Sequence, residues 1–412
     1  MHHERYLRAA LLYQQHRYAD TERELLDLLA GEASNTDALH LLAATYLAQQ
    51  RIAEARTAAG QVLAIAPGNS DAHALLARIE LVDDSPSKAE THARQAITME
   101  PGESAHYGIL ALVMLRLREP QAALAAADQG LALDPEDLQC LNMRTEALAR
   151  LGRKEEADHT IQETLRLDPE NPYTHSNTGW AMLRQGEHHK ALEHFRESLR
   201  RDPTNDHAKA GMVEALKARY TVYRLFLRYM FWVGSMKQGA QWALIIGIYF
   251  GQRMLGSLTG IPWLAPFIWP VLILMVLFVL STWVMVPLSN LLLRLNKYGR
   301  YALDREETIS SYFTAAALSI AVVGGIAFLA GGPMGFLAMC LFGLVMMIPL
   351  ASMLGGRKRS KTLLIAAAGL VALLGIVGVW SVFRTGDVMD PIMRTFFYAN
   401  LGYQILANVV RG

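Results

Sequence analysis

The stretch LALDPED at residues 131–137 recurs with small changes through the first half of the chain. Its relatives are LAIAPGN at 63–69, ITMEPGE at 97–103, LRLDPEN at 165–171 and LRRDPTN at 199–205. The prolines of these stretches follow one another at a constant spacing, and an alanine precedes each of them at a second constant spacing. The prolines are Pro67, Pro101, Pro135, Pro169 and Pro203, and the alanines are Ala55, Ala89, Ala123, Ala157 and Ala191. Because a small side chain lets two helices approach closely, the pattern predicts a repeated helix pair.

A helix pair with a small contact residue and a closing proline resembles the tetratricopeptide repeat, whose period of about 34 residues is the spacing of the prolines. The phase predicts five repeats over residues 36–205, and residues 2–35 fit as a degenerate first repeat. Residues 206–218 are predicted to close the array with one more helix. One repeat cannot bury its apolar face alone, so the repeats must stack into a superhelix with a concave inner face. We therefore expect an all-α domain over residues 1–218.

The family resemblance implies that the concave face binds a protein or peptide, and that the first helix of each repeat supplies most of that face. Three arginines occupy equivalent positions in successive repeats on these helices. The candidate partner-binding residues are Arg116, Arg150 and Arg184, together with Asn142, Tyr173, Asn177 and Trp180. A series of guanidinium groups suits an acidic or phosphorylated partner. The alternative is that each arginine only closes its helix, where a cation interacts favourably with the helix dipole.

The second half of the chain has a different composition. Residues 1–218 hold 33 acidic and 23 basic side chains, whereas residues 219–412 hold 5 acidic and 16 basic ones. In the second half the basic residues lie between apolar runs of membrane length, which indicates a helical transmembrane bundle rather than a nucleic-acid-binding surface. We predict a transmembrane domain over 241–383 with five spans. The apolar stretches are 241–259, 265–293, 312–331, 334–354 and 362–383.

The basic residues of the second half predict its orientation. They form three clusters, at 219–237, 294–305 and 357–361, and the positive-inside rule places all three in the cytoplasm. The N-terminus lacks the apolar core of a signal peptide, so the repeat domain is expected there as well. Arginine outnumbers lysine 30 to 9 and alanine is abundant, which hints at a GC-rich bacterium. The expected location is therefore the inner membrane of a bacterial cell. Residues 219–240 are expected to form an amphipathic juxtamembrane helix.

The tail, 384–412, allows two interpretations. Residues 391–411 should form a helix in which Asn400, Gln404 and Asn408 make a polar stripe along one face. The helix is either a sixth span that packs the stripe inside a bundle or an amphipathic helix on the outer surface. We prefer the surface helix on sequence grounds alone.

Ionisable residues are scarce in the predicted spans, and Arg253 is the exception. We expect it to pair with Asp387 or Asp390 in the outer loop, or else to reach the membrane surface without a partner. Coupled transport and proton relays normally need ionisable groups at membrane depth. Their scarcity therefore argues against coupled transport.

The sequence contains no arrangement typical of an enzyme or of a cofactor site. It has no nucleophile–base pair, phosphate-binding loop or dinucleotide fingerprint. The tightest histidine group, His188, His189 and His194, lacks the spacing that places two imidazoles on one helix face, and we interpret His188 and His189 as a solvated loop pair. We thus predict no metal, no cofactor and no nucleic-acid partner.

The predicted function is a membrane-anchored scaffold that binds a protein or peptide partner. The many spans exceed what a tether needs, which suggests contact with a membrane protein or with a second copy. The alternative is a regulatory or pore-forming subunit of a transport complex that the repeat domain gates.

Overall fold

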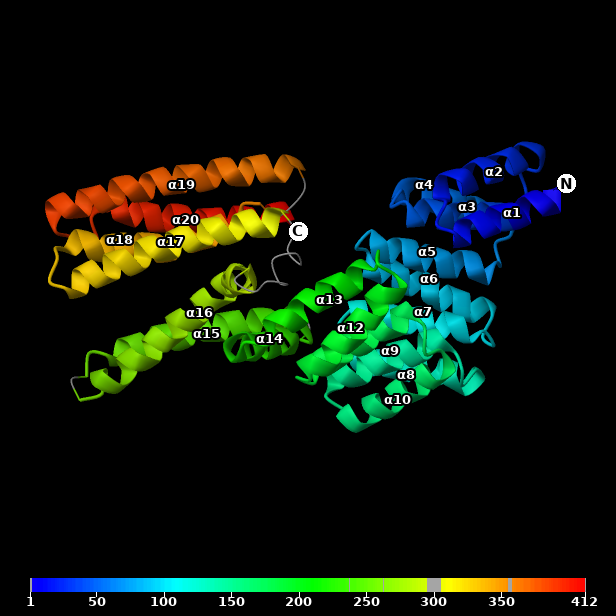
Figure 1. The fold of residues 1–412 in the computed structure, drawn as a ribbon, viewed down its shortest axis with the longest axis horizontal. Helices are drawn as coiled ribbons and strands as arrows, with labels where there is room; N and C mark the ends of the chain where they lie inside the picture. Colours follow the sequence, from blue (N-terminus) through cyan, green and yellow to red (C-terminus); the bar gives the residue numbers. More distant parts are fainter. Residues whose placement is uncertain (1, 237, 262, 295–304, 355–357, 412) are drawn as a thin grey trace. The chain divides into compact units, whose positions relative to one another are not determined.

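The computed structural model describes residues 2–236, 238–261, 263–294, 305–354 and 358–411. Over these residues the chain consists of helices, turns and loops without β-strands, which confirms the predicted all-α class. Figure 1 shows paired helices in both halves of the sequence.

The chain divides into two compact units. The first unit contains Met1–Met212 together with Met230–Gln241. The second contains Val213–Tyr229 together with Trp242–Gly412. The first unit is therefore more than the repeat array, because it also includes a short segment from the predicted juxtamembrane region.

The repeat array consists of consecutive antiparallel helix pairs followed by a closing helix (Figure 1). The pairs are α1 (His2–Gln14) with α2 (Tyr18–Gly31), α3 (Thr36–Ala48) with α4 (Ile52–Ile65), α5 (Ser70–Val82) with α6 (Pro86–Met99), α7 (Ser104–Arg116) with α8 (Pro120–Leu133), α9 (Leu138–Leu151) with α10 (Lys154–Leu167), and α11 (Pro172–Arg184) with α12 (His188–Arg201). The closing helix is α13 (Asp206–Lys217).

The turn inside each pair contains one residue with a left-handed backbone conformation. These residues are His16, Gln50, Asp84, Arg118, Gly152 and Gly186, and they recur with the same period as the prolines. The α1–α2 pair has this turn as well, so residues 2–35 adopt the repeat geometry despite their degenerate sequence. A capping side chain precedes the first helix of several pairs. Asn35, for example, accepts a hydrogen bond from the backbone N–H of Ala38 at the start of α3.

Small residues form the contacts between the helices of the array. All five alanines that precede the prolines are fully buried. In the last repeat a large side chain is buried as well as the small Ala191. Phe195 is fully buried, and a Cβ atom added to Gly179 of α11 or Gly211 of α13 would lie within 2.6 Å of its ring. The two glycines thus make room for Phe195 between three helices.

The remaining helices belong largely to the second unit. They are α14 (Thr221–Gly234), α15 (Gln238–Leu258), α16 (Ala265–Arg294), α17 (Arg305–Leu329), α18 (Met334–Ser352), α19 (Lys358–Thr385) and α20 (Pro391–Arg411). Among the residues that the structure describes, three of these helices are long and apolar enough to cross a membrane, over Arg305–Leu329, Met334–Ser352 and Lys361–Thr385. These helices correspond to the last three of the five predicted spans.

The other two predicted spans coincide with α15 and α16. Several of their side chains lie outside the described residues, so the count of five spans stays a prediction. Lys297, Arg300 and Arg357 of the basic clusters also lie outside the described residues. Close to two of these clusters, Lys361 of α19 forms an ion pair with Glu306 of α17. The pair brings the starts of α17 and α19 together, as expected if both clusters lie on one side of a membrane.

Helices α17 and α18 form the hairpin that the Gly331–Gly332–Pro333 sequence predicts. Gly331 adopts a positive φ of 89°, and the backbone N–H of Gly332 donates to the carbonyl of Ala327. Along the hairpin the two backbones are very close. A Cβ atom added to Gly343 would lie 2.6 Å from the carbonyl oxygen of Ala317.

Helix α20 packs along α18 and α19 within the second unit (Figure 1). Its buried Asn400 donates a hydrogen bond to the carbonyl of Val345, and Gln404 donates to Asn400. Further along, the hydroxyls of Tyr403 and Ser352 lie 3.0 Å apart. The described part of the polar stripe therefore faces the bundle. Both interpretations of α20, as a sixth span and as a surface helix, stay predictions.

Candidate binding groove on the repeat array

A cavity of about 620 Å³ lies on the face that the first helices of the repeats share. Helices α3, α5, α7, α9 and α11 contribute most of its lining, and α13 adds one residue. The lining residues are Leu47, Arg78, Leu81, Val82, Leu112, Leu115, Arg116, Met143, Glu146, Arg150, Tyr173, Asn177, Trp180, Arg184 and His207. Six of the seven residues predicted from the sequence are among them, so the structure brings these six together in one groove.

The three predicted arginines of the groove have different surroundings. Arg116 is exposed at the end of α7. Arg150 forms an ion pair with Glu146 at 2.7 Å, and its Nη1 donates to the carbonyl of Leu115. Arg184 shares the same Glu146 carboxylate at 3.2 Å. One carboxylate thus interacts with two guanidinium groups, and the groove keeps an excess of positive charge.

Arg184 is the most enclosed of the three, with 17% of its side chain exposed. Burial lowers the pKa of its guanidinium, and Arg150 nearby acts in the same direction. The Nε of Arg184 has no hydrogen-bond partner among the described residues. A buried guanidinium with an unused N–H is a strong donor for a carboxylate or a carbonyl group.

The position of each arginine also fits the alternative interpretation. Each lies in the last turn of its helix, where a cation is favourable. The two interpretations are compatible, because the last turns of α7, α9 and α11 end along one side of the same groove. Closing a helix and lining the groove are therefore two effects of one repeated position.

Aromatic residues line the α11 end of the groove. Trp180 stacks on the His207 ring with centroids 5.4 Å apart, and its Nε1 donates to the His207 carbonyl. Burial lowers the pKa of His207, so its ring is neutral at pH 7. Tyr173 is 45% exposed in the same groove. An aromatic surface beside cationic groups can bind both apolar and acidic parts of a peptide.

Asn142 is the prediction that the structure corrects. Its side chain lies in the interior of the array and is only 3% exposed. Its amide donates to the carbonyl of Leu138 and to the hydroxyl of Thr174, and its oxygen accepts from Asn177. The amide joins α9 to α11 and does not line the groove. The repeat register identifies the helix correctly but not which way this side chain points.

The sequence analysis also missed several groove residues. Leu81, Leu112 and Met143 give the groove an apolar floor, and His207 enters it from the closing helix. Apolar residues on these helices are expected at many positions, so periodicity alone does not separate the floor of the groove from the core. The contribution of His207 depends on how α13 packs.

The histidines of the array form pairs rather than a loop cluster. Nδ1 of His73 lies 3.3 Å from Nδ1 of His92, and the same atoms of His175 and His194 are 3.1 Å apart. His188, which we expected to be solvated, is buried at the start of α12. Over the described part of the chain, no three His, Cys, Asp or Glu side chains lie close enough together to hold a metal ion.

The structure does not bring together the three residues predicted to pair near the membrane. Arg253 is exposed on α15. Asp390 caps α20 by accepting the N–H of Ile392, and Asp387 accepts the N–H of Met389. In the described ranges no ion pair joins Arg253 to either aspartate, and their pairing stays a prediction.

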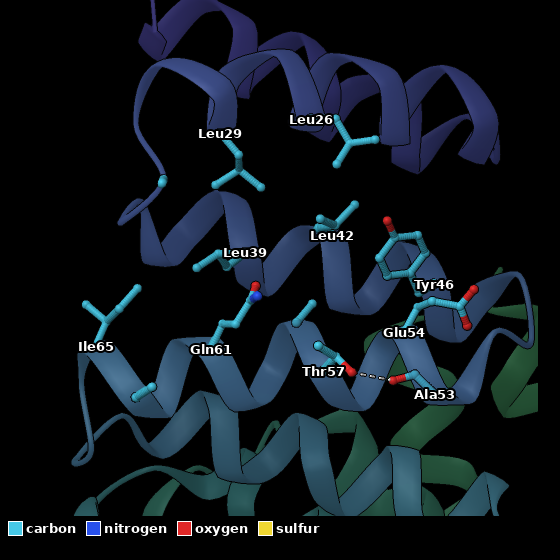
Figure 2. A pocket seen from close by; sticks show the side chains of 13 residues that line it. Leu26, Leu29, Leu39, Leu42, Tyr46, Ala53, Glu54, Thr57, Gln61 and Ile65 are labelled. Atoms are coloured by element: carbon cyan, nitrogen blue, oxygen red, sulfur yellow. Dashed lines mark hydrogen bonds between the residues drawn. The ribbon is translucent and has the colours of Figure 1, made fainter.

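A second cavity, of about 680 Å³, lies near the start of the array between α2 and α4, over α3. Figure 2 shows Leu26 and Leu29 pointing into it from α2, and Gln61 and Thr57 from α4, while Leu42 of α3 points toward Leu26. Its lining is mostly aliphatic, and α4 presents alanines where larger side chains would fill the space.

The stacked helix pairs and their shared groove define a class of α-helical repeat proteins that act as interaction scaffolds. Residues 12–79, 74–137 and 142–206 match family models described as tetratricopeptide repeats. Residues 12–206 are tetratricopeptide repeats, as the sequence predicts. Such repeats bind protein or peptide partners and are typically non-enzymatic scaffolds.

Several solved structures are similar to part of this chain. A tetratricopeptide-repeat protein of Thermus thermophilus is 19% identical, with a TM-score of 0.41, over 44% of this chain and 98% of its own. A tetratricopeptide-repeat protein of Parabacteroides merdae is 12% identical, with a TM-score of 0.42, over 59% of this chain and 96% of its own. The structure of pilF from Pseudomonas aeruginosa is 16% identical, with a TM-score of 0.38, over 50% of this chain and 90% of its own. A comparison with curated proteins finds no match.

Proposed function

We propose that this protein is a membrane-anchored scaffold that binds a protein or peptide partner in the groove of its repeat array. The observation that carries the proposal is the groove itself. It collects Arg116, Arg150 and Arg184 with Tyr173 and Trp180 in a cavity of about 620 Å³. A cavity of this size with aromatic and cationic walls suits a short segment of a partner protein.

The charge of the groove favours an acidic partner. Arg150 and Arg184 share the carboxylate of Glu146, and Arg116 adds a further positive charge. The first half of the chain is acidic as a whole, so the positive groove differs from the rest of that half. A partner with carboxylate or phosphate groups would pair with Arg116 and with the unused Nε of Arg184.

The apolar helices of the second unit would hold the bound partner at a bilayer. We place the protein in a bacterial inner membrane with the repeat domain in the cytoplasm. The basic loops support this orientation. The packing of α20 along α18 and α19 supports a further span, which would put both termini on the cytoplasmic side if α15 and α16 also cross.

The test uses the full-length protein in nanodiscs as bait for a cytoplasmic extract. We expect it to retain a specific partner, and the variant Arg116→Glu to lose most of that binding because it reverses the exposed charge of the groove. Arg196→Glu is the matched control, since it makes the same charge reversal at an exposed position of α12, away from the groove. Equal losses in both variants would contradict binding in the groove.

A second measurement separates the scaffold from the transport alternative. Purified protein in liposomes should show no flux of ions or small solutes if it acts only as a scaffold. Flux that depends on the repeat domain would instead favour the gated subunit, as would failure to retain any partner.

A further inference from the structure

A segment of the same chain that follows the closing helix packs against the array near the groove. The first unit includes Met230–Gln241, which follows the predicted juxtamembrane region in sequence. Phe231, Gly234 and Met236 of this segment contact the array or line a cavity in it, and they lie at the end of α14 and just after it. We call Met230–Met236 the juxtamembrane segment.

An aromatic side chain of the juxtamembrane segment contacts the buried arginine of the groove. The Phe231 ring lies under the Arg184 guanidinium, with the Cζ atom 4.4 Å from the ring centroid. Its edge also meets Trp180, with the centroids 6.4 Å apart. A cation over an aromatic face is attractive, and more so when the pair is shielded from water.

A second contact fixes the end of the juxtamembrane segment. Nη1 of Arg118 donates a hydrogen bond of 3.3 Å to the carbonyl oxygen of Met236. Arg118 occupies the left-handed turn position between α7 and α8, with φ of 61°. The repeat turn therefore contributes a cation that binds a main-chain acceptor.

Between these two contacts the juxtamembrane segment covers the ends of the arginine helices. A cavity of about 290 Å³ remains there, and Gly234 forms part of its wall. Its other lining residues are Leu81, Asp84, Pro86, Leu115, Arg116, Arg118 and Arg150. Arg116 and Arg150 line both this cavity and the larger groove, so the segment lies against one end of the proposed partner site.

We propose that the juxtamembrane segment is an intramolecular ligand of the groove, and that an incoming partner displaces it with an aromatic side chain flanked by carboxylates. This inference rests on the proposed function. The contacts define the chemistry of the competitor. An aromatic ring replaces Phe231 against Arg184 and Trp180, and carboxylates replace the Met236 carbonyl at Arg118 and also pair with Arg116.

An internal ligand reduces the apparent affinity for a partner in proportion to the fraction of time that the groove is open. Removal of Phe231 should shorten that time and leave Arg184 open. If the segment covers the groove about nine-tenths of the time, Phe231→Ala should tighten partner binding about tenfold.

The test measures binding of a fluorescein-labelled acidic peptide with one central phenylalanine to the full chain in nanodiscs. We expect weak binding to the natural protein and binding about tenfold tighter to Phe231→Ala. A peptide with alanine in place of phenylalanine should bind both proteins more weakly than the phenylalanine peptide does. Phe267→Ala, the same change at an exposed position of α16, is the control and should behave like the natural protein. Equal affinity for Phe231→Ala and the natural protein would overturn the proposal.

A second measurement does not depend on the choice of peptide. A thiol introduced by Ser235→Cys should react slowly with a membrane-impermeant maleimide, and several-fold faster when Phe231→Ala is added. An unchanged rate would show that the segment is not held in the groove. If the nanodisc bait retains a partner yet neither measurement responds to Phe231→Ala, this inference fails and the proposed function stands. If neither the natural protein nor Phe231→Ala retains a partner, the proposed function itself fails.

Discussion

The repeat array and the α17–α18 hairpin both consist of antiparallel helix pairs, but they use different residues at their closest contacts. In the array the contact residue is alanine, such as Ala123, which is fully buried. In the hairpin it is glycine, and a Cβ atom at Gly324 or Gly343 would lie 2.6–2.7 Å from the facing backbone. In water, burial of apolar surface drives helices together, and a methyl group can be accommodated. Between helices in lipid this driving force is absent, so direct backbone contact matters more.

The largest expected effect is on the stability of the last repeat, where the large side chain of Phe195 is buried between helices. Phe195→Ala should lower the free energy of unfolding of the last repeat by about 3–5 kcal/mol, because it leaves a cavity between α11, α12 and α13. Each repeat contacts only its neighbours, so the loss should stay local. Hydrogen exchange of the backbone amides in full-length protein measures it. Amides of α11 should lose protection, while those of α1 keep theirs.

The control for Phe195 is Leu133→Ala, which truncates a half-exposed side chain at the end of α8. It should change stability by less than about 0.5 kcal/mol. If both variants reduce protection equally, close packing around Phe195 is not what holds the last repeat.

The next effect tests the glycine contacts of the hairpin. Gly343→Leu should cost about 3 kcal/mol, since the side chain would have to displace the backbone of α17 at Ala317 and Ala321. Thermal unfolding in detergent measures the change. Gly369→Leu is the matched control, because a Cβ atom there meets no atom within 4 Å. Equal melting temperatures for the two variants would contradict close packing of α17 and α18.

These contacts also show how far the sequence could predict the fold. The period of the prolines predicts the helix pairs, and it places Arg116, Arg150 and Arg184 on one side of one groove. It does so because a repeated unit puts equivalent residues in equivalent places. The register does not predict which way each side chain points. It therefore could not reveal that the Asn142 side chain lies in the interior of the array.

Contacts between distant parts of the sequence were beyond prediction. Phe231 meets Arg184 only because a segment after the closing helix packs against the array. No repeat position indicates that contact. The polar stripe on α20 was visible in the sequence, but its direction depended on polar groups of α18, such as the Val345 carbonyl and Ser352.

A smaller effect is expected in acid, which should reduce the stability of the repeat array more than that of the α17–α18 hairpin. Burial, and then the neighbouring His175, lower the pKa of His194 to about 4 in the folded array. The unfolded chain binds a proton near pH 6.5, so the contribution of His194 to stability is complete above pH 6.5 and is lost as the pH falls toward about 4. All thirteen histidines lie in residues 1–207, so acid should affect the array first.

We expect the array to lose about 2 kcal/mol from this histidine between pH 7 and pH 4.5, after allowance for its partial exposure. Urea unfolding followed at several pH values measures the slope. His194→Gln should flatten it, because glutamine binds no proton in this range. An unchanged slope in that variant would mean that other groups cause the acid sensitivity.

The smallest expected effect concerns the residue with a left-handed backbone conformation in the turn inside each helix pair. Gln50 and Gly152 occupy the same turn position in two repeats, and both have positive φ, of 61° and 73°. A side chain in this conformation is strained, whereas glycine adopts it readily. Gln50→Gly should therefore raise the melting temperature, with a gain of about 0.5–1 kcal/mol. Gly152→Ala is the reverse change and should destabilise by about 1 kcal/mol, since a Cβ atom there has open space and only the backbone conformation opposes it. If both variants shift the melting temperature in the same direction, the turn conformation does not set the stability of these repeats.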